Sequence, residues 1–397
     1  MKIAISAGDP SGDEHGARII STVRTLCPEA TVFGMGGSAL RSVGVETLID
    51  SETDASVMGF VDVIKSLGTL RRALKRMTRL LEERAPDVLL LVDYQDFNLL
   101  LAKKAKRLGI RTVFFIAPTV WAWRSGRAKS FRKYVDALAC IFPFEPAVFR
   151  SLGYDNAQFV GHPFGDNFSQ FTFTREKRAA LRKEFGIEDD ELALALFAGS
   201  RNQEVRNLLP LLVETLHRVR QTLPNVKGII PVPSSISEPE LRERIHELGA
   251  EEIIRIVPQR SVEVLGACDA GLIKSGTSNL QAALAGLPFA MMYRAGWLMR
   301  SIVRLCSKVD SYSIVNIIRP NTVREFVSEQ ALSPAVLADE AIELLRDEPR
   351  RKAQLLAFHE IKNFLTPKKD SCPSFSHAEP QHLVAERVAR MVIRDSN

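Results

Sequence analysis

The sequence predicts an α/β protein with two tandem Rossmann-like, doubly wound domains followed by C-terminal helices. The chain has 397 residues, of which 46% are hydrophobic and 25% charged, so it is long enough for two or three domains with cores of their own. Short apolar runs alternate with longer amphipathic stretches, as buried parallel strands alternate with helices. The alternation starts again after about residue 165, and two such sheets in tandem predict a cleft between the domains.

Eight apolar runs are the predicted strands. They are residues 3–7, 88–92, 113–117 and 138–142 in the first half, and residues 192–198, 226–232, 253–257 and 270–273 in the second. A polar stretch beginning at Gly165 separates the halves. We therefore expect a first domain at 1–164, a second at 165–345, and C-terminal helices at 346–397. These helices are expected to pack back on the first domain or on a second copy of the chain, as in a homodimer.

The cysteine spacing and the apolar runs indicate in which cellular compartment the protein is expected. The five cysteines are scattered and lack the short spacings of a zinc site or a redox pair. The N-terminal apolar run is too short for a signal peptide. The uncharged stretch 275–293 carries too many polar and helix-breaking residues for a spanning helix. A reduced, cytoplasmic protein is expected.

Positive charge is concentrated in the first third of the chain. The net charge is only +6, yet residues 97–135 hold ten basic residues and no acidic one. A second basic stretch, residues 65–84, is a predicted helix. An anionic ligand or surface is expected there. Nucleic acid is not an expected partner, because no nucleic-acid-binding module is recognisable.

A glycine-containing loop follows the first predicted strand. Ser11, Gly12 and Asp13 lie in it, before a helix that is expected to begin near Glu14. Glycine lets a ligand approach the backbone, and a helix N-terminus offers unpaired N–H groups. The loop therefore either contacts a ligand or simply supplies the helix N-cap through Ser11 or Asp13.

Two carboxylates follow the strand at 88–92. Asp93 and Asp96 are expected at the carboxyl edge of the sheet, where open α/β sheets bind ligands. A carboxylate there suits general-base catalysis on a hydroxyl group. The alternative is that Asp96 caps the helix predicted at 97–106.

The loop after the next strand carries two tryptophans and an arginine. Trp123 suits stacking on a sugar, and the adjacent Arg124 suits a phosphate. The alternative for at least one of the tryptophans is packing in the core.

Two strand ends in the second half combine glycine and hydroxyl residues with a helix start. The residues concerned are Gly199, Ser200 and Arg201 at the first, and Ser275, Gly276 and Thr277 at the second. Ser200 with Gln203, and Ser278 with Gln281, also have the spacing of a capping box. Helix N-termini favour anions, and arginine binds phosphate. Together the two loops predict a nucleotide-diphosphate site.

Other chemistries are disfavoured. The seven histidines are dispersed and predict no metal site. A Gly-x-Ser-x-Gly nucleophile elbow is missing, and the glycines after the first strand lack the dinucleotide-binding spacing. No cofactor is therefore expected.

Taken together, these residues resemble those of the lipid A disaccharide synthases, inverting glycosyltransferases of the two-Rossmann GT-B architecture. The matching stretches come in family order: 8–17, 56–61, 93–98, 118–124, 143–145, 161–163, 199–201 with 204–205, 275–277, 293–294, Asn316 and Glu325. The resemblance implies metal-independent transfer of 2,3-diacylglucosamine from UDP-2,3-diacylglucosamine to 2,3-diacylglucosamine 1-phosphate, with a β-1,6 disaccharide phosphate and UDP as products. The alternative is a related GT-B transferase that uses a different UDP-sugar or lipid acceptor.

The resemblance also implies residue roles. Asp96 deprotonates or orients the acceptor 6-hydroxyl, and Arg201 neutralises the leaving UDP diphosphate. Gln281 and Asn316 belong to the donor site. The family has Glu where Gln281 stands and Glu where Asp9 stands. An amide makes weaker hydrogen bonds to ribose hydroxyls than a carboxylate, so donor affinity is the property expected to differ.

Acylated substrates also imply contact with a membrane. Each buried CH₂ contributes about 0.8 kcal/mol, so such sugars stay in the bilayer. The protein is therefore expected to work as a peripheral protein on the cytoplasmic face of the inner membrane. The candidate contact surfaces are the basic helix at 65–84 and the segment 297–304, where arginines flank apolar residues. The alternative is that each is an ordinary amphipathic helix packed on the core.

Overall fold

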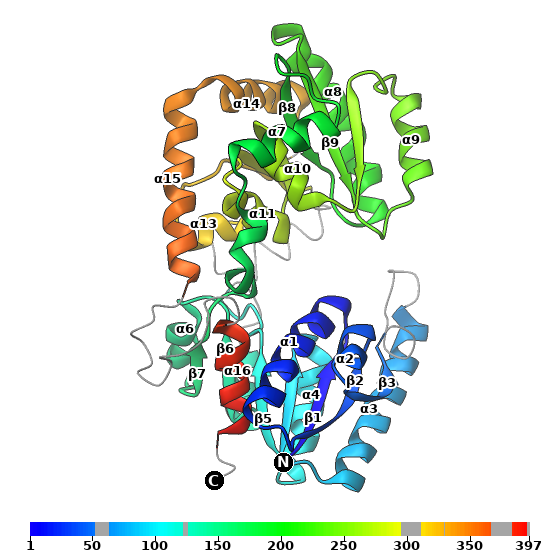
Figure 1. The fold of residues 1–397 in the computed structure, drawn as a ribbon, viewed down its shortest axis with the longest axis vertical. Helices are drawn as coiled ribbons and strands as arrows, with labels where there is room; N and C mark the ends of the chain where they lie inside the picture. Colours follow the sequence, from blue (N-terminus) through cyan, green and yellow to red (C-terminus); the bar gives the residue numbers. More distant parts are fainter. Residues whose placement is uncertain (52–62, 122–125, 295–310, 329, 367–382, 395–397) are drawn as a thin grey trace. The chain divides into compact units, whose positions relative to one another are not determined.

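The computed structural model describes residues 1–51, 63–121, 126–294, 311–328, 330–366 and 383–394. They form two compact units, Met1–Asn167 with Leu365–Asn397, and Phe168–Phe364. Each unit is built on one parallel sheet with helices on its faces (Figure 1), so the expected pair of Rossmann-like α/β domains is confirmed. The predicted membrane segment 297–304 lies outside the described residues, as does the matching stretch 56–61.

The sheet of the first unit has seven strands in the order β3-β2-β1-β4-β5-β6-β7. Their bounds are β1 Lys2–Ala7, β2 Thr31–Gly36, β3 Glu46–Asp50, β4 Val88–Val92, β5 Arg111–Phe115, β6 Ala137–Cys140 and β7 Ala157–Phe159. Every residue of β4 is buried, because helices cover both faces of the sheet. The parallel pairing sets Ala7 opposite Val92, so the loops after β1 and β4 begin side by side.

Helices cover both faces of this first sheet. Their bounds are α1 Pro10–Leu26, α2 Ser38–Ser42, α3 Val63–Arg84, α4 Gln95–Arg107, α5 Arg127–Tyr134, α6 Glu145–Ser151 and α16 Leu383–Ile393. On one face, Met77 of α3, Leu101 of α4 and Phe131 of α5 pack in one core with Phe114. On the other face, α1 and α16 share a second core.

The last helix is attached to the first unit at both of its ends. At the N-terminus of α16, the carboxylate of Asp166 accepts hydrogen bonds from the N–H groups of Val384 and Ala385, at 2.7 and 3.2 Å. At the C-terminus, the guanidinium of Arg111 donates to the carbonyls of Met391 and Val392, at 2.8 and 3.1 Å. These contacts satisfy groups that have no partner inside a helix.

The sheet of the second unit has six strands in the order β10-β9-β8-β11-β12-β13. Their bounds are β8 Leu192–Phe197, β9 Val226–Val232, β10 Ile254–Pro258, β11 Ala270–Lys274, β12 Phe289–Met292 and β13 Glu325–Phe326. The two central strands, β8 and β11, pair with each other in parallel. Both strands end at the same edge of the sheet, in the two loops of the predicted nucleotide site.

The helices of the second unit are α7 Arg175–Glu184, α8 Asn202–Thr222, α9 Glu238–Glu247, α10 Ser261–Ala267, α11 Thr277–Ala285, α13 Ile314–Ile318, α14 Pro334–Arg346 and α15 Glu348–Leu365. Leu212 and Leu216 of α8 pack with Leu337 of α14 in one core above the sheet. The predicted third segment, 346–397, is divided between the units. Gln354 of α15 exchanges hydrogen bonds with the backbone of Phe289 in the second unit, whereas α16 packs on the first.

We predict that Asp166→Ala loosens α16. Loss of both cap hydrogen bonds costs about 1–2 kcal/mol, because an N-cap carboxylate is replaced by a methyl group. The amides of Leu383–Ile393 should then exchange with deuterium roughly 5- to 30-fold faster. Asp155→Ala, at an exposed position of the same unit, is the matched control. Unchanged protection of α16 in Asp166→Ala would contradict this role.

Candidate active site

The loop after β1 is shaped by Asp9. Asp9 is the N-cap of α1, and its Oδ1 accepts a hydrogen bond from the N–H of Gly12 at 2.7 Å. Helix α1 therefore begins at Pro10, and the predictions of a start near Glu14 and of a cap at Ser11 or Asp13 were wrong.

Asp13 caps a different helix. Its Oδ1 accepts from the N–H of Gly37 at 2.6 Å and its Oδ2 from the N–H of Ala39 at 2.8 Å, at the start of α2. The Asp13 side chain is buried and its carboxylate makes this contact, while the contact of its loop with a ligand stays a prediction. Ser11 is exposed, and its Oγ lies 3.4 Å from His15 Nε2. Burial, and then the charge of Arg18, lower the pKa of His15 to about 4.

The loop after β4 has an unusual backbone. Asp93 and Tyr94 are consecutive left-handed residues, with φ of +45° and +43°, a conformation that non-glycine residues adopt only at some cost. The buried side chain of Asn98 supports it, because Nδ2 donates to the carbonyls of Val92 and Asp93 at 3.1 and 2.8 Å. Its Oδ1 accepts from Ser6 Oγ of β1 at 2.6 Å. Asn98 thus joins the ends of the two strands.

Tyr94 also explains a glycine of the neighbouring loop. A Cβ on Gly8 would lie 2.2 Å from the Tyr94 ring, so only glycine permits this close approach of the β1 and β4 loops. Asp93 and Asp9 follow these paired strand ends. Burial, and then the charge of Asp9, raise the pKa of Asp93 to about 6, although the N–H of Tyr94 lowers it.

Asp96, the predicted catalytic carboxylate, lies in the first turn of α4. Helix α4 begins at Gln95 with Tyr94 as its N-cap, so the alternative that Asp96 caps the helix was wrong. Its side chain is 76% exposed and forms an ion pair with Arg127 of α5. Arg127 also donates to Gln95 Oε1 at 3.2 Å. The carboxylate is therefore accessible to a ligand and held from one side.

Trp123 and Arg124 lie outside the described residues. The other tryptophan of this loop, Trp121, donates from Nε1 to Glu145 Oε1 at 3.2 Å and packs edge-on against Phe144. Trp121 is therefore half-buried and packed against other aromatic side chains, in keeping with the packing alternative. Burial raises the pKa of Glu145 to about 7, although the N–H groups of Phe142 and Ile141 and the Trp121 indole hydrogen-bond to the carboxylate and lower it.

In the second unit, Glu204 organises the loop after β8. Arg201 is the N-cap of α8 without a capping side chain, so the predicted capping box of Ser200 and Gln203 was wrong. Instead, Glu204 Oε2 accepts from the N–H of Ser200 at 3.1 Å. Gly199 has φ of +116°, and a Cβ there would lie 2.3 Å from Glu204 Oε2. The loop and the carboxylate therefore require a glycine at this position.

The loop after β11 turns directly into α11. Gly276 is its N-cap, with φ of +149°, and has no capping side chain, so the predicted capping box of Ser278 and Gln281 was also wrong. Asn279 holds the turn instead, because its Nδ2 donates to the carbonyl of Lys274 at 2.9 Å. The first N–H groups of α11 have no partner inside the helix.

The two loops of the second unit line one cavity of about 350 Å³. Its lining residues are Phe197, Ala198, Gly199, Ser200, Arg201, Glu204, Pro231, Pro233, Ser261, Lys274, Ser275, Gly276, Thr277 and Ser278. The structure thus brings six of the eight predicted donor-site residues together, namely Gly199 to Arg201 and Ser275 to Thr277. Sequence reasoning did not assign a role to Lys274, whose Nζ lies 2.8 Å from Glu204 Oε1.

The remaining two predicted donor-site residues do not line this cavity. Gln281 is half-buried on α11. Asn316 is buried, its Nδ2 donates to the Val323 carbonyl and to Glu325 Oε1 at 2.8 and 2.7 Å, and its Oδ1 accepts from the N–H of Val323 at 2.9 Å. Asn316 therefore supports the loop before β13, and its assignment to the donor site stays a prediction.

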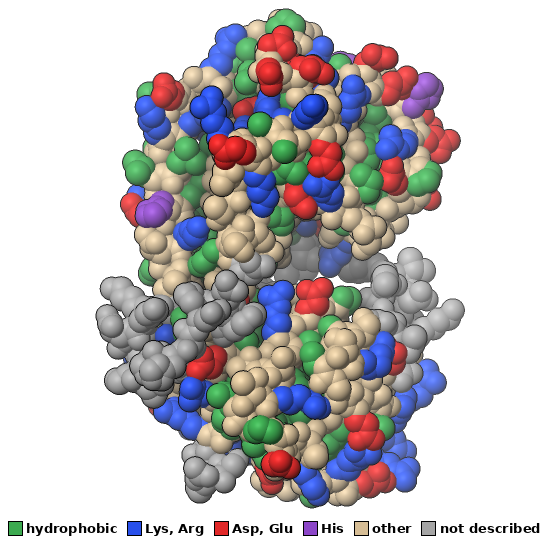
Figure 2. Space-filling view, viewed as in Figure 1, with side chains coloured by type: hydrophobic (Ala, Val, Ile, Leu, Met, Phe, Trp, Pro, Cys, Tyr) green, Lys and Arg blue, Asp and Glu red, His purple; other side chains and the backbone are tan. Residues whose placement is uncertain are grey.

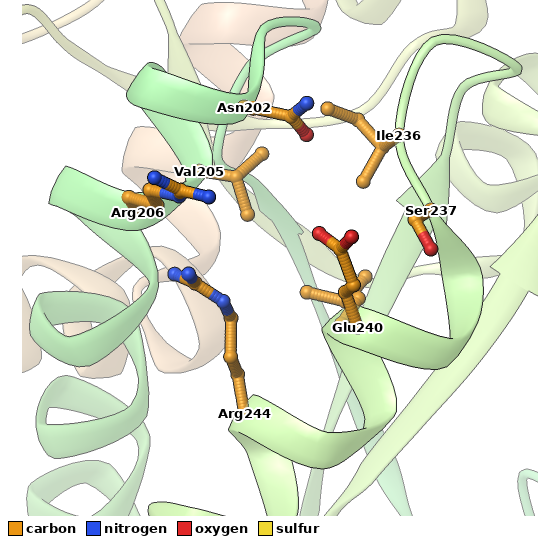
Figure 3. Close-up of a pocket in the computed structure, with 8 residues that line it drawn as sticks. Asn202, Val205, Arg206, Ile236, Ser237, Glu240 and Arg244 are labelled. Carbon is orange, nitrogen blue, oxygen red and sulfur yellow. The ribbon is translucent and has the colours of Figure 1, made fainter.

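A second crevice of the second unit is too small for such a ligand. Figure 3 shows its residues on α8, on α9 and in the loop before α9, among them Arg206, Glu240 and Arg244. Its volume of about 10 Å³ is room for at most about one water molecule. Among the described residues, moreover, three or more His, Cys, Asp or Glu side chains nowhere gather as a metal site would require.

Comparisons with known proteins agree with this geometry. The family model described as lipid-A-disaccharide synthetase matches residues 3–376. The lipid-A-disaccharide synthase of Nitrosococcus oceani is 38% identical over 363 residues, which cover 91% of this chain and 92% of that protein. That of Anaeromyxobacter dehalogenans is 36% identical over 361 residues, with 91% and 92% covered.

Solved structures share the fold. The UDP-GlcNAc 2-epimerase from Neisseria meningitidis bound to UDP-GlcNAc matches with a TM-score of 0.60 at 13% identity, covering 92% of this chain and 99% of that one. Anabaena HepE in complex with UDP-glucose matches with a TM-score of 0.54 at 15% identity, covering 92% and 98%. At these identities the likeness shows the two-Rossmann architecture alone.

We predict that Asp93→Asn stabilises the protein at neutral pH. The folded-state pKa of Asp93 is raised from 3.8 to about 6, so ionisation of the folded protein is unfavourable. The cost is absent below pH 4, grows between pH 4 and 6, and reaches about 2–3 kcal/mol above pH 6. Asparagine also tolerates the left-handed backbone.

The urea midpoint of Asp93→Asn should therefore exceed that of the wild type at pH 7.5 and equal it at pH 4. Asp96→Asn removes an exposed carboxylate in the first turn of the following helix and serves as the control. A gain for Asp93→Asn that is equal at both pH values would refute the explanation.

Proposed function

The chain belongs to the lipid-A-disaccharide synthase family of glycosyltransferases, and we propose that it transfers 2,3-diacylglucosamine from UDP-2,3-diacylglucosamine to 2,3-diacylglucosamine 1-phosphate. The products are UDP and a β-1,6-linked disaccharide phosphate. The observation that carries this proposal is the cavity of the second unit, where two glycine turns and two helix N-termini meet beside Arg201.

The donor's UDP group fits the chemistry of this cavity. Helix N-termini carry partial positive charge and free N–H groups, so a diphosphate is favoured there. The Arg201 side chain is 83% exposed and can reach phosphate oxygens with two parallel hydrogen bonds. As the bond from the anomeric carbon to UDP breaks, negative charge grows on the diphosphate, and these groups stabilise it. This assignment uses protein groups and needs no metal ion.

The acceptor is activated in the first unit. In an inverting displacement, the acceptor's 6-hydroxyl oxygen attacks the anomeric carbon from the face opposite UDP while its proton passes to a base. We assign that base to Asp96, because its carboxylate is exposed and paired with Arg127 of α5, whose guanidinium also donates to Gln95 Oε1. The attacking oxygen forms the new glycosidic bond, and the electron pair of the broken bond leaves with UDP.

The first unit also carries a cationic surface suited to a membrane. Helices α3, α4 and α5 cover the same face of the sheet and carry many exposed or partly exposed basic residues, among them Arg71, Arg72, Lys75, Arg76, Arg79, Lys103, Lys104, Lys106, Arg107, Lys129, Arg132 and Lys133. Figure 2 shows Lys and Arg side chains along the α3 edge of this unit. None of the described helices is long and apolar enough to cross a membrane.

We propose that this surface docks on the anionic lipids of the cytoplasmic face of the inner membrane. Each Lys or Arg near such a surface contributes about 1 kcal/mol. Docking would bring the first unit, with Asp96, to substrates whose acyl chains stay in the bilayer.

We predict that Asp96→Asn lowers kcat for disaccharide formation by about 10²–10⁴, the usual value of a general base. Folding should be unaffected, because the Asp96 side chain is exposed. Disaccharide is measured with detergent-dispersed substrates and mass spectrometry. Asp155→Asn is the control at an exposed site. Turnover of Asp96→Asn within about threefold of the wild type would remove Asp96 from the mechanism.

A second prediction concerns the cationic surface. Changing Arg71, Arg72 and Lys75 of α3 to Glu should weaken binding to vesicles that contain phosphatidylglycerol by about a hundredfold or more, because three attractions are lost. Cosedimentation measures the binding, and neutral phosphatidylcholine vesicles give the background. The matched control makes the same charge change at Arg175, Lys183 and Lys352 in the second unit. Equal losses in both triple variants would show that net charge, and not this surface, drives binding.

A further inference from the structure

We propose that Lys274 is a second phosphate-binding cation of the donor cavity, acting beside Arg201 on the diphosphate of the nucleotide. The inference rests on the proposed function, because it takes a uridine diphosphate as the ligand of this cavity. Lys274 is an addition to the donor-site residues that were predicted from the glycine and hydroxyl motifs of the two loops.

The position of Lys274 is unusual for a lysine. It is the last residue of β11, whose preceding four residues are all buried, and it lines the cavity at the point where the chain turns toward α11. Its side chain is 23% exposed, and Asn279 anchors its carbonyl. A lysine at the end of a buried central strand places its ammonium at the carboxyl edge of the sheet, where ligands of such sheets bind.

Glu204 fixes the direction of the lysine side chain. Its Oε1 lies 2.8 Å from Lys274 Nζ and 3.8 Å from Arg201 Nη1, and its Oε2 accepts from the N–H of Ser200. One carboxylate therefore connects the cation at the end of β11 with the loop after β8. An ammonium has three donors, and the described contacts of Lys274 Nζ use one of them. The others are available to a ligand in the cavity.

Charge balance gives the lysine its importance. Glu204 carries one negative charge, and burial opposed by the Lys274 hydrogen bond and charge leaves its pKa below the usual value, so it stays ionised at neutral pH. With Arg201 alone, the charges of arginine and glutamate would cancel beside the ligand. Lys274 restores a net positive charge, which a diphosphate requires from a site with an acidic neighbour.

The second unit also contains a matched ion pair that does not face the cavity. Lys227 of β9 lies 2.8 Å from Glu191, and the two side chains are 14% and 18% exposed. This pair resembles that of Lys274 and Glu204 in distance and exposure. Lys227 lies near the start of its strand and does not line the cavity. Lys227 Nζ also donates to the Gly186 carbonyl at 3.1 Å, so substitution of Lys227 reports the loss of a structural lysine away from the cavity.

The test is calorimetric titration of uridine, UMP and UDP into the full-length protein and its variants. Lys274→Met should weaken UDP binding about 10-fold or more, since a hydrogen bond to a charged group is lost. It should weaken UMP binding less and leave uridine binding unchanged. Lys274→Gln, which keeps a polar contact with Glu204, should behave like Lys274→Met, and Lys274→Arg should stay within about threefold of the wild type. Lys227→Met should bind UDP as the wild type does.

Two outcomes would overturn the inference while the proposed function stands. One is UDP binding by Lys274→Gln at wild-type strength, and the other is an equal loss for uridine, UMP and UDP, which would make the lysine merely structural. A wild-type protein that binds UDP no better than uridine would instead refute the donor cavity itself. Raising the salt concentration adds an independent measure, because UDP binding to Lys274→Gln should depend on salt less steeply than that of the wild type.

Discussion

The parallel arrangement of the strands is the constraint on which both sites depend. In a sheet whose strands all run the same way, every strand ends at one edge and every following helix begins there, with its N–H groups pointing outward. The pairing of β1 with β4 brings Asp9 and Asp93 together in the first unit, and the pairing of β8 with β11 brings Arg201 and Lys274 to one cavity in the second. The chemistry is therefore assembled from loops that lie far apart in the sequence.

Buried or half-buried polar side chains then hold these loops in shape. Asn98 ties the strained turn after β4 to β1, Glu204 ties the glycine turn after β8 to Lys274, and Asn316 holds the segment that leads to β13. Each of these side chains pairs with a polar group that would cost free energy if it were left buried without a hydrogen bond. Two of the proposed ligand-binding groups, Asp96 and Arg201, are in contrast exposed. A preorganised site needs both loops that are held rigidly by hydrogen bonds and ligand-binding groups that are accessible.

Much of the fold and of the site could be predicted from the sequence. Buried parallel strands leave long apolar runs, so the eight predicted strands correspond to β1, β4, β5, β6, β8, β9, β10 and β11. Short edge strands such as β7 and β13, with three and two residues, have too little pattern to be seen. Glycine turns were found because the positive φ of Gly199 and of Gly276, and the close approach of Glu204 at Gly199, favour that residue.

Side-chain partners were harder to predict, for a physical reason. A capping box is a local pattern, but the N–H groups of a helix N-terminus can donate to any oxygen that the fold places near them. Asp13 of α1 therefore caps the neighbouring helix α2, and the Glu204 carboxylate, not Gln203, accepts from the N–H of Ser200. The ion pair of Asp96 with Arg127 joins residues 31 positions apart, so no spacing rule shows it. The resemblance to a family located the catalytic candidate, whereas only the structure gave its surroundings.

Product analysis tests the central claim most directly. The purified protein is incubated with UDP-2,3-diacylglucosamine and 2,3-diacylglucosamine 1-phosphate in detergent, the released UDP is quantified, and the glycosidic linkage is determined by NMR. We expect one UDP for each disaccharide and a β linkage to the acceptor's 6-oxygen. Release of UDP without a disaccharide, or an α linkage, would contradict inverting transfer between these substrates.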